Sequence, residues 1–529
     1  MRSFLYRFQV RSIICLITIF AMMLVCIVRI INICSDEKLA LSSNNTLTVD
    51  LQSKRGEIYD CNGKKITSSS YKYAVVFLPT ENALVKYASL TSGEQRQIGL
   101  SKLRQKKPTV LIKDKPINEK GIYSYKISER YSDIISLEHI IGYVDDKNHG
   151  SMGLEKAYDD LLFSNDELSV SFTQDASGEF LLGVEPILNN NVVDSALYLT
   201  IDSDIQKIAV SAAKSIQKGA VVITEVSSGK IRAMVSKPNF DINNLSEFIN
   251  RDDSPFLNRA LSAYSVGSVF KPLIAAAMLE TKKGDFMHIC NGYSEFLGLR
   301  FYCNKHSGHG KMNMSDALAF SCNTYFYNGA QQISCNALSS LASAFGFGNR
   351  VKIAESVFSQ KGNITSLEQL QKSSAAVANF AIGQGDIALS PLVLTNLYSA
   401  IANDGVFYEP TIIEAVKNNG EYKRGKTGEK NIVLSKATAA VLKEDLINAV
   451  DKGTGASAKP EFYGAGGKTA TAQTGRFENK KEILNAWFCG FFPAKKPKYV
   501  IVIMSENAMS GGDDCGPIFK KIADEIAKL

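Results

Sequence analysis

The chain has 529 residues, of which 45% are hydrophobic and 21% charged, and its formal net charge is +7. This length exceeds one ordinary domain and is enough for at least two cores, and the composition excludes a disordered or repetitive chain. The small positive charge suits a location near anionic membrane or wall polymers, although an ordinary basic surface explains it equally well. Basic residues do not cluster with aromatic ones, so we expect no nucleic-acid partner.

Residues 1–34 predict a cytoplasmic tail and a membrane anchor. Residues 12–28 are uncharged and strongly apolar, and the apolar run continues after Arg29, which gives the roughly 20 residues that a spanning helix needs. Arg2, Arg7 and Arg11 precede the run, so the positive-inside rule predicts a cytoplasmic N-terminus. No small-residue cleavage site follows, which favours an uncleaved single-pass anchor with the remaining chain outside the cell.

Residues 35–193 predict a separate module and a linker. Short β-like runs at 73–77 and 109–112 alternate with polar, lysine-rich helical stretches, and no catalytic constellation is found among them. Strand-like segments and a run of asparagines at 189–191 follow, and we expect residues 164–193 to connect this module to the next.

Residues 194–529 predict an α+β domain. The pattern favours a helix over 204–218, a strand pair over 220–226 and 230–236, two strands over 487–492 and 498–504, and a closing helix over 516–529. These elements suggest a central antiparallel sheet with helices on both faces.

Three short motifs in this domain predict one acyl-transfer site. They are, in chain order, Ser268-Val-Phe-Lys271, Ser321-Cys-Asn323 and Lys468-Thr469. A serine three residues before a lysine is weak evidence for a catalytic site by itself, because Ser227 and Lys230 show the same spacing. The first motif differs because glycine precedes it and proline and a helix-forming run follow. We therefore expect Ser268 at the start of a helix, with Lys271 one turn later on the same face.

The chemistry explains why these residue types are needed. A serine hydroxyl is a poor nucleophile until a base takes its proton. Lys271 can act as that base only when neutral, and lowering its pKa from about 10.4 to about 7 costs roughly 4–5 kcal/mol. Burial, a helix N-terminus and a second cation, Lys468, all act in that direction. Ser321 offers a hydroxyl that relays protons, and Asn323 offers an amide that orients a peptide bond.

Together with other segments, these motifs resemble the class B penicillin-binding proteins, the D,D-transpeptidases that cross-link bacterial peptidoglycan. The resemblance covers nearly the whole chain. The further matching segments are Arg55-Gly-Glu-Ile-Tyr-Asp-Cys-Asn-Gly63, His139-Ile-Ile-Gly-Tyr143, Gly153-Leu-Glu-Lys-Ala-Tyr158, Leu199-Thr-Ile-Asp202, Gly219-Ala-Val-Val222, Gly383-Gln-Gly385 and Ala486-Trp-Phe488.

The resemblance implies a role for each motif residue. Ser268 would be acylated by the penultimate D-alanine, and Lys271 would be its general base. The backbone N–H groups of Ser268 and Thr471 would hold the oxyanion. Ser321 and Asn323 would line the opposite side of the cleft.

The edge strand would bind the substrate. The resemblance implies that Lys468 and Thr469 hold the carboxylate of the terminal D-alanine. The family usually has Lys-Thr-Gly-Thr here, whereas this chain has Ala470 in the third position. Strand alternation puts residue 470 on the face of Lys468, so a methyl group would crowd the cleft. We expect activity or β-lactam affinity that is retained but altered.

The resemblance also implies partners and a location. These are peptidoglycan stem peptides on a lipid-linked precursor polymer, β-lactams as covalent inhibitors, and a glycosyltransferase embedded in the same bacterial membrane. Residues 35–193 would be a pedestal that lifts the active site from the membrane. No cofactor or metal is expected.

Ten cysteines need a separate interpretation, because seven of them follow the anchor and would face an oxidising exterior. Cys290, Cys303, His306 and His309 could imitate a zinc ligand set, but the family has no metal and we expect none here. We hypothesise instead a disulfide between Cys322 and Cys303 that distorts the cleft. A small buried thiol behind the active site is the alternative.

Two other classes share the three motifs. A serine β-lactamase or a β-lactam sensor would hydrolyse or merely bind the drug, but the pedestal-like module and the Arg55 segment argue against both. A non-catalytic scaffold of the wall-building machinery would keep the fold without the activity. Ala470, which departs from the usual motif, gives this alternative some support.

Overall fold

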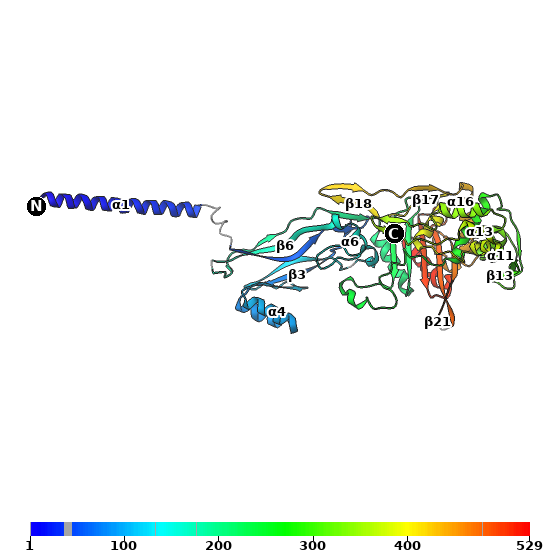
Figure 1. Cartoon of the computed structure of the whole chain (residues 1–529), viewed down its shortest axis with the longest axis horizontal. Coiled ribbons are helices and arrows are strands. Elements are labelled where there is room, and N and C mark those ends of the chain that lie inside the picture. The colour runs from blue at the N-terminus through cyan, green and yellow to red at the C-terminus, as the bar shows by residue number, and fades with distance from the viewer. Residues whose placement is uncertain (1, 36–44, 133, 176, 479) are drawn as a thin grey trace. The chain divides into compact units, whose positions relative to one another are not determined.

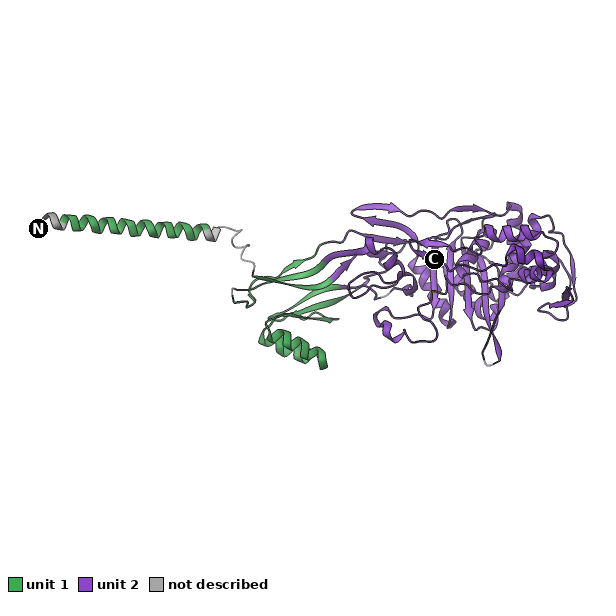
Figure 2. Ribbon diagram, in the orientation of Figure 1, with its two compact units in different colours: residues 1–52, 72–127, 167–191 green, residues 53–71, 128–166, 192–529 purple. Residues whose placement is uncertain are grey.

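The computed structural model describes residues 2–35, 45–132, 134–175, 177–478 and 480–529, which form two compact units (Figures 1 and 2). Unit 1 contains residues 1–52, 72–127 and 167–191, and unit 2 contains residues 53–71, 128–166 and 192–529. The chain therefore enters unit 2 three times. Two stretches of the expected pedestal, residues 53–71 and 128–166, belong to the unit that carries the three motifs.

The N-terminal segment is one long helix, α1 (Arg2–Ser35). Its part Tyr6–Asn32 is long and apolar enough to cross a membrane, and its side chains are exposed in the structure. The expected apolar span, residues 12–28, lies inside this part. Apolar side chains all round a helix have no reason to stay in water, so α1 is a candidate membrane anchor.

Besides α1, unit 1 contains most of two three-stranded sheets and two further helices. Along β3, Ala74 and Val76 belong to one core cluster, whereas Val75 and Phe77 belong to another. The strand therefore buries both faces, as alternation along a strand requires. The elements of unit 1 are β1 (Thr46–Arg55), β6 (Phe163–Thr173) and β7 (Ile187–Asn189) in one sheet, β4 (Thr109–Lys113), β3 (Ser70–Phe77) and β5 (Ile122–Glu129) in the other, and the helices α3 (Glu81–Leu90) and α4 (Gly93–Arg104).

An antiparallel five-stranded sheet is the centre of unit 2. Its order is β10 (Ile231–Lys237), β9 (Gly219–Glu225), β23 (Tyr499–Glu506), β22 (Lys481–Phe492) and β21 (Gly466–Glu478). In β23, Val500 and Val502 belong to one core cluster, and Ile501 and Ile503 belong to the other. Both faces are thus buried, which confirms the predicted central sheet flanked by helices.

Helices cover the two faces of this sheet. The cluster on one face includes residues of α8 (Ser203–Ala212) and α17 (Gly516–Ile526). The cluster on the other face includes residues of α9 (Lys271–Glu280), α10 (Met314–Ala319), α11 (Asn323–Ala330), α12 (Cys335–Ala344), α15 (Pro391–Ala402) and α16 (Lys436–Asp451).

Smaller elements complete unit 2. A four-stranded sheet has the order β19 (Glu421–Arg424), β18 (Ile413–Asn418), β8 (Ala196–Leu199) and β2 (Glu57–Tyr59). Paired short strands are β11 (His288–Cys290) with β14 (Gly310–Met312), β12 (Tyr293–Phe296) with β13 (Leu299–Tyr302), β15 (Lys352–Ala354) with β16 (Val357–Phe358), and β17 (Val406–Tyr408) with β20 (Lys430–Ile432). The remaining helices and turns are α5 (Glu138–Ile141), α6 (Gly153–Ala157), α7 (Asp159–Leu162), η1 (Ala213–Ser215), η2 (Ile242–Glu247), η3 (Gly267–Phe270), α13 (Leu367–Lys372), α14 (Ser374–Ala381), η4 (Ala456–Ala458) and η5 (Gly511–Cys515).

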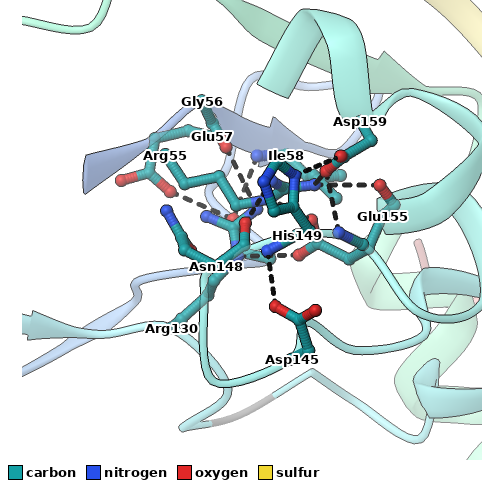
Figure 3. Close-up of polar contacts among 12 residues, drawn as sticks. Arg55, Gly56, Glu57, Ile58, Arg130, Asp145, Asn148, His149, Glu155 and Asp159 are labelled. Carbon is teal, nitrogen blue, oxygen red and sulfur yellow. Dashed lines mark hydrogen bonds and ion pairs between the residues drawn. The ribbon is translucent and has the colours of Figure 1, made fainter. Parts of the chain in front are cut away.

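A buried ion network joins two of the family-like segments within unit 2 (Figure 3). Arg55 Nε lies 2.6 Å from Glu155 Oε2, and Arg130 Nε lies 2.7 Å from Glu155 Oε1. Arg55 also reaches Asp159 Oδ1 at 2.7 Å. The side chain of Glu155 has no exposed surface. Burial alone would raise the pKa of Glu155, but the two guanidinium groups outweigh it and hold that pKa below its ordinary value.

Candidate active site

The segment around Ser268 is a tight turn that runs directly into a helix. Residues Gly267–Phe270 form the 3-10 turn η3, and α9 begins at Lys271. Residues three apart in such a turn share a face, so this backbone allows Ser268 and Lys271 to face the same way. Gly267 has φ +61°, and a Cβ there would lie 3.2 Å from Ala472 Cβ, so the turn needs glycine to approach β21 this closely.

This segment is held in place by other elements. Three hydrogen bonds reach it, from Trp487 Nε1 to Ser265 O at 2.9 Å, from the Tyr398 hydroxyl to Val269 O at 2.9 Å, and from the Gly267 N–H to Gly383 O at 3.0 Å. Trp487 and Tyr398 are fully buried, so neither has water as an alternative partner. The nucleophile candidate therefore sits on a rigid support.

Lys271 is fully buried and its amine points at the second motif. Its Nζ donates to Asn323 Oδ1 at 2.6 Å, to Ser321 O at 2.8 Å and to Ser321 Oγ at 3.1 Å. The ring of Phe326 lies 5.6 Å from the amine. Burial lowers the pKa of Lys271 to about 8, although the thiols of Cys322 and Cys303 work in the opposite direction. An amine with this pKa is neutral often enough near neutral pH to accept a proton.

Ser321 occupies the turn between α10 and α11, and Asn323 is the first residue of α11. Ser321 has φ +57°, a left-handed conformation that costs a non-glycine residue about 1–3 kcal/mol. Such a backbone conformation persists only where neighbouring contacts hold it in place. Asn323, two residues later, supplies such contacts. Its side chain accepts a hydrogen bond from Lys271 Nζ and donates one through Nδ2 to Tyr302 O at 3.3 Å.

The third motif lies on the edge strand β21. Lys468 and Ala470 are buried on one side of it, and Thr471 is exposed on the other. Lys468 Nζ donates to Thr469 O at 3.1 Å and approaches Thr454 Oγ1 at 3.5 Å. Burial, and secondarily the charge of Lys271, holds the pKa of Lys468 well below its ordinary value. The charge of Lys271 thus acts on Lys468, whereas from the sequence we expected Lys468 to act on Lys271.

One cavity of about 510 Å³ contains parts of all three motifs. Both lysines lie beneath its wall, because neither has any exposed surface. A larger cavity of about 650 Å³ has none of the motif residues among the described residues that line it. The site cavity is lined by Gly267, Ser268, Asn304, Ser321, Asn323, Ile382, Gln384, Thr454, Thr469, Ala470, Thr471, Gln473, Ser510, Gly511, Gly512 and Asp513.

Thr454 was missed by the sequence prediction. Its hydroxyl lies 2.9 Å from Thr469 Oγ1, so two hydroxyls stand side by side above Lys468. Thr454 N–H donates to Ala319 O at 2.9 Å, and a Cβ at Gly453 would lie 2.2 Å from the same oxygen. The available signal was the Gly453-Thr-Gly455 run, which marks a tight turn.

A second missed feature is the turn η5, which forms one rim of the cavity. The N–H of Gly511 donates to Thr471 Oγ1 at 3.3 Å. A Cβ at Gly511 would lie 2.4 Å from both Ala470 O and Trp487 O, so the turn packs directly on the backbone of β21 and β22. The Gly511-Gly512 pair followed by two aspartates predicts a turn, but nothing in it indicates which strand the turn contacts.

Comparison with known proteins bears on this geometry. The sequence model of the penicillin binding protein transpeptidase domain matches residues 219–524. Stage V sporulation protein D of Bacillus subtilis is 28% identical over 90% of this chain and 78% of its own length. Peptidoglycan D,D-transpeptidase PbpA of Mycolicibacterium smegmatis is 30% identical over 69% of this chain and 76% of its own length.

Solved structures share the fold. The D,D-transpeptidase domain of a peptidoglycan glycosyltransferase from Eggerthella lenta matches with a TM-score of 0.66 and 23% identity, over 90% of this chain and 98% of that one. Penicillin binding protein 3 from Mycobacterium tuberculosis, in complex with ampicillin, matches with a TM-score of 0.67 and 21% identity, over 91% of this chain and 96% of that one.

Proposed function

The chain belongs to the penicillin-binding protein transpeptidase family, and on that premise we propose that it is a serine D,D-transpeptidase that cross-links peptidoglycan stem peptides through an acyl-enzyme. One observation carries the proposal. A single cavity gathers Ser268, Ser321 and Asn323, and Thr469 with Thr471 from three segments far apart in the chain, above two buried lysines.

In the first step, Ser268 Oγ attacks the carbonyl carbon of the penultimate D-alanine. The hydroxyl proton passes to the neutral amine of Lys271. A neutral amine has two N–H bonds, which it can donate to acceptors, and one lone pair, which can take the proton. These two bonds suit the acceptors Asn323 Oδ1 and Ser321 O. The C–N bond then breaks, and the terminal D-alanine leaves as the free amine after it receives a proton through Ser321.

The oxyanion and the substrate carboxylate need separate partners. The backbone N–H groups of Ser268 and Thr471 would hold the oxyanion, each worth about 3 kcal/mol by analogy with other acyl transfer. The hydroxyls of Thr469 and Thr454 would receive the terminal carboxylate. Lys468 lies beneath them without exposed surface, so it would act on the carboxylate through these hydroxyls.

In the second step, the amine of a neighbouring stem peptide attacks the ester carbonyl and displaces Ser268 Oγ. Lys271 takes a proton from the attacking amine and gives it to Ser268 Oγ, which restores the serine hydroxyl. A β-lactam mimics the D-alanyl-D-alanine unit and leaves an acyl group on the same oxygen. β-Lactams are therefore covalent inhibitors of this enzyme.

The anchor α1 supports a membrane location. With Arg2, Arg7 and Arg11 ahead of the apolar run, the N-terminus would remain in the cytoplasm and the chain that follows the anchor would lie outside it. Residues 35–193 would serve as the pedestal module and linker, and 194–529 as the transpeptidase domain. The substrate would reach the site as a lipid-linked polymer made by a glycosyltransferase in the same membrane.

Labelling with a fluorescent penicillin, followed by peptide mapping, tests this function. We expect one stable label per chain on Ser268, and loss of labelling in Ser268→Ala. Ser227→Ala is the matched control, because Ser227 also stands three residues before a lysine but is exposed on a turn. Rapid turnover of the penicillin would indicate a lactamase, and labelling of Ser268→Ala would remove Ser268 from the mechanism.

A further inference from the structure

Four sulfur and nitrogen ligands converge directly behind the second motif. They are Cys290, Cys303, His309 and Cys322, and their ligand atoms all lie within 4.8 Å of one another. The three cysteines are buried and free, and His309 is half-buried. Each comes from a different place in unit 2, because Cys290 ends β11, Cys303 follows β13, His309 precedes β14 and Cys322 precedes α11.

The two sulfur–nitrogen distances in this cluster match those of tetrahedral zinc. His309 Nδ1 lies 3.6 Å from Cys290 Sγ and 3.5 Å from Cys303 Sγ. Zn–S bonds of about 2.3 Å and a Zn–N bond of about 2.0–2.1 Å at tetrahedral angles put sulfur and nitrogen about 3.5–3.6 Å apart. Hydrogen bonds to sulfur have similar lengths, so the case for an ion rests on four metal-ligating side chains, three of them thiols, whose ligand atoms all meet within 4.8 Å of one another.

We propose that Cys290, Cys303 and Cys322 as thiolates, with His309 through Nδ1, bind one structural zinc ion. Three soft sulfur ligands and one imidazole in a closed tetrahedral arrangement suit zinc, and oxygen-preferring magnesium or calcium does not fit such a set. Four protein ligands leave no position for water, so the ion would have a structural role.

The backbone around the cluster is built for close approach. Gly308 has φ +81°, and a Cβ there would lie 2.2 Å from Cys290 O. Gly292 has φ +92°, and a Cβ there would lie 1.9 Å from His306 O, while its own carbonyl accepts from Cys303 N–H at 2.8 Å. These turns bring the strand ends together at the ligands.

This site differs from the arrangements considered from the sequence. His306 is exposed and stacks on Tyr302 at 5.5 Å, so it is outside the cluster, and Cys322 takes the fourth place. A disulfide between Cys303 and Cys322 would consume two of the four ligands. Zinc and that disulfide therefore exclude each other.

The ion would hold the second motif in position. Cys322 lies between Ser321, whose backbone is left-handed, and Asn323, and both neighbours supply acceptors to the Lys271 amine. Asn323 also contacts Tyr302 O, next to the ligand Cys303. A zinc ion bound to Cys322 would connect this turn to β11, β13 and β14. It would thereby hold the oxygens of Ser321 and Asn323 in place beside Lys271, although the backbone of Ser321 is strained.

Metal analysis of the full-length protein in detergent, purified without a histidine tag or added metal, tests the site. We expect about one zinc per chain, and cobalt(II) exchanged into the same protein should give the intense visible bands and thiolate charge-transfer absorption of a tetrahedral S₃N site. Cys290→Ser should lower the zinc content to well below one per chain. Cys335→Ser is the control that retains it, since Cys335 lies at the start of α12, outside the cluster.

Two results would overturn the proposal. One is wild-type protein that carries no zinc and whose unreduced peptides show a Cys303–Cys322 disulfide. The other is zinc retained at one per chain in Cys290→Ser, or cobalt spectra of wild-type protein without thiolate charge transfer. The spectra and the wild-type zinc content do not depend on whether a variant folds, and neither depends on the proposed catalytic function.

Discussion

Lys271 combines complete burial with three hydrogen-bond acceptors, and these two features pull its charge in opposite directions. Burial disfavours the ammonium, whereas Ser321 and Asn323 oxygens favour it. Burial prevails and brings the pKa to about 8. About one amine in ten is then neutral at pH 7, compared with fewer than one in a thousand for a free lysine.

The rate of acylation by a penicillin should therefore depend on pH through this group. The active form is the neutral amine, so the second-order rate constant should rise about tenfold per unit below about pH 8 and level off above it. Stopped-flow measurements between about pH 6 and about pH 9 give this profile. Lys271→Ala should show a low rate with no rise through this range. A wild-type profile that is flat or falls with pH would contradict the base assignment.

Ala470 is among the residues that line the site cavity, at a position where the family usually has glycine. We expect Ala470→Gly to acylate about fivefold faster, because relief of crowding is worth about 1 kcal/mol. The extra backbone freedom should lower the free energy of unfolding by roughly 0.5–1 kcal/mol. Penicillin acylation kinetics and thermal unfolding measure the two effects separately. An unchanged acylation rate would show that the methyl group does not crowd the cleft.

The motif residues could be predicted from the sequence because each one combines a reactive residue type with a local signal. Ser268, for example, stands between a glycine and a helix start. Thr454 could not be predicted this way. Its role depends on the contact with Thr469 across two elements, and threonine in a glycine-rich turn has no distinctive spacing.

At the scale of elements, strand prediction worked where both faces of the strand are buried. The expected strands 220–226 and 498–504 differ from β9 and β23 by one or two residues, because continuous apolar runs marked them. β22 begins six residues before the expected start at 487. Residues 481–484 are not buried, so this end of the hairpin with β21 carries no apolar pattern to detect.

Breaking the ion network around Glu155 should destabilise its part of unit 2. Glu155→Gln leaves the buried guanidinium of Arg55 and the largely buried one of Arg130 without their shared carboxylate, and we expect a loss of about 3 kcal/mol in the free energy of unfolding. Denaturant titration of the full chain measures it. Glu368→Gln is the control, because its partner Lys372 and the carboxylate are both exposed, and we expect a change within about 0.5 kcal/mol.

The same network predicts a pH dependence. The pKa of Glu155 lies below its ordinary value of 4.5, so its contribution to stability is present above that value and is lost as pH falls through the lowered pKa. The stability difference between wild type and Glu155→Gln should therefore shrink in acid. A difference that stays constant from neutral pH to strong acid would mean that the carboxylate charge does not stabilise the fold.

For the whole molecule, the sequence indicated an anchor, a non-catalytic region and a catalytic region, but not how the chain is shared between units. Residues 53–71 and 128–166 join unit 2 through long-range contacts such as the pairing of Glu57 with Ala196 and the ion pair of Arg55 with Glu155. Partners so far apart in the chain leave no mark in local periodicity. A division into consecutive ranges could not capture this arrangement.

The proposed orientation predicts which end of the chain is accessible from outside. In cells stripped of their wall, added protease should remove a C-terminal epitope tag and spare an N-terminal one. Immunoblots of both tags in intact and lysed cells measure this. Protection of the C-terminal tag in intact cells would reverse the topology and would place the site in the wrong compartment for peptidoglycan.

The central claim is that Ser268 captures a D-alanyl donor. The most direct measurement is intact-mass and peptide-mapping analysis of the full-length protein after incubation with a synthetic stem peptide ending in D-alanyl-D-alanine, together with quantification of free D-alanine. We predict one acyl group on the Ser268 peptide and one D-alanine released for each acyl-enzyme formed, with neither in Ser268→Ala. Release of D-alanine by Ser268→Ala, or an acyl group on another residue of the wild-type protein, would contradict the account.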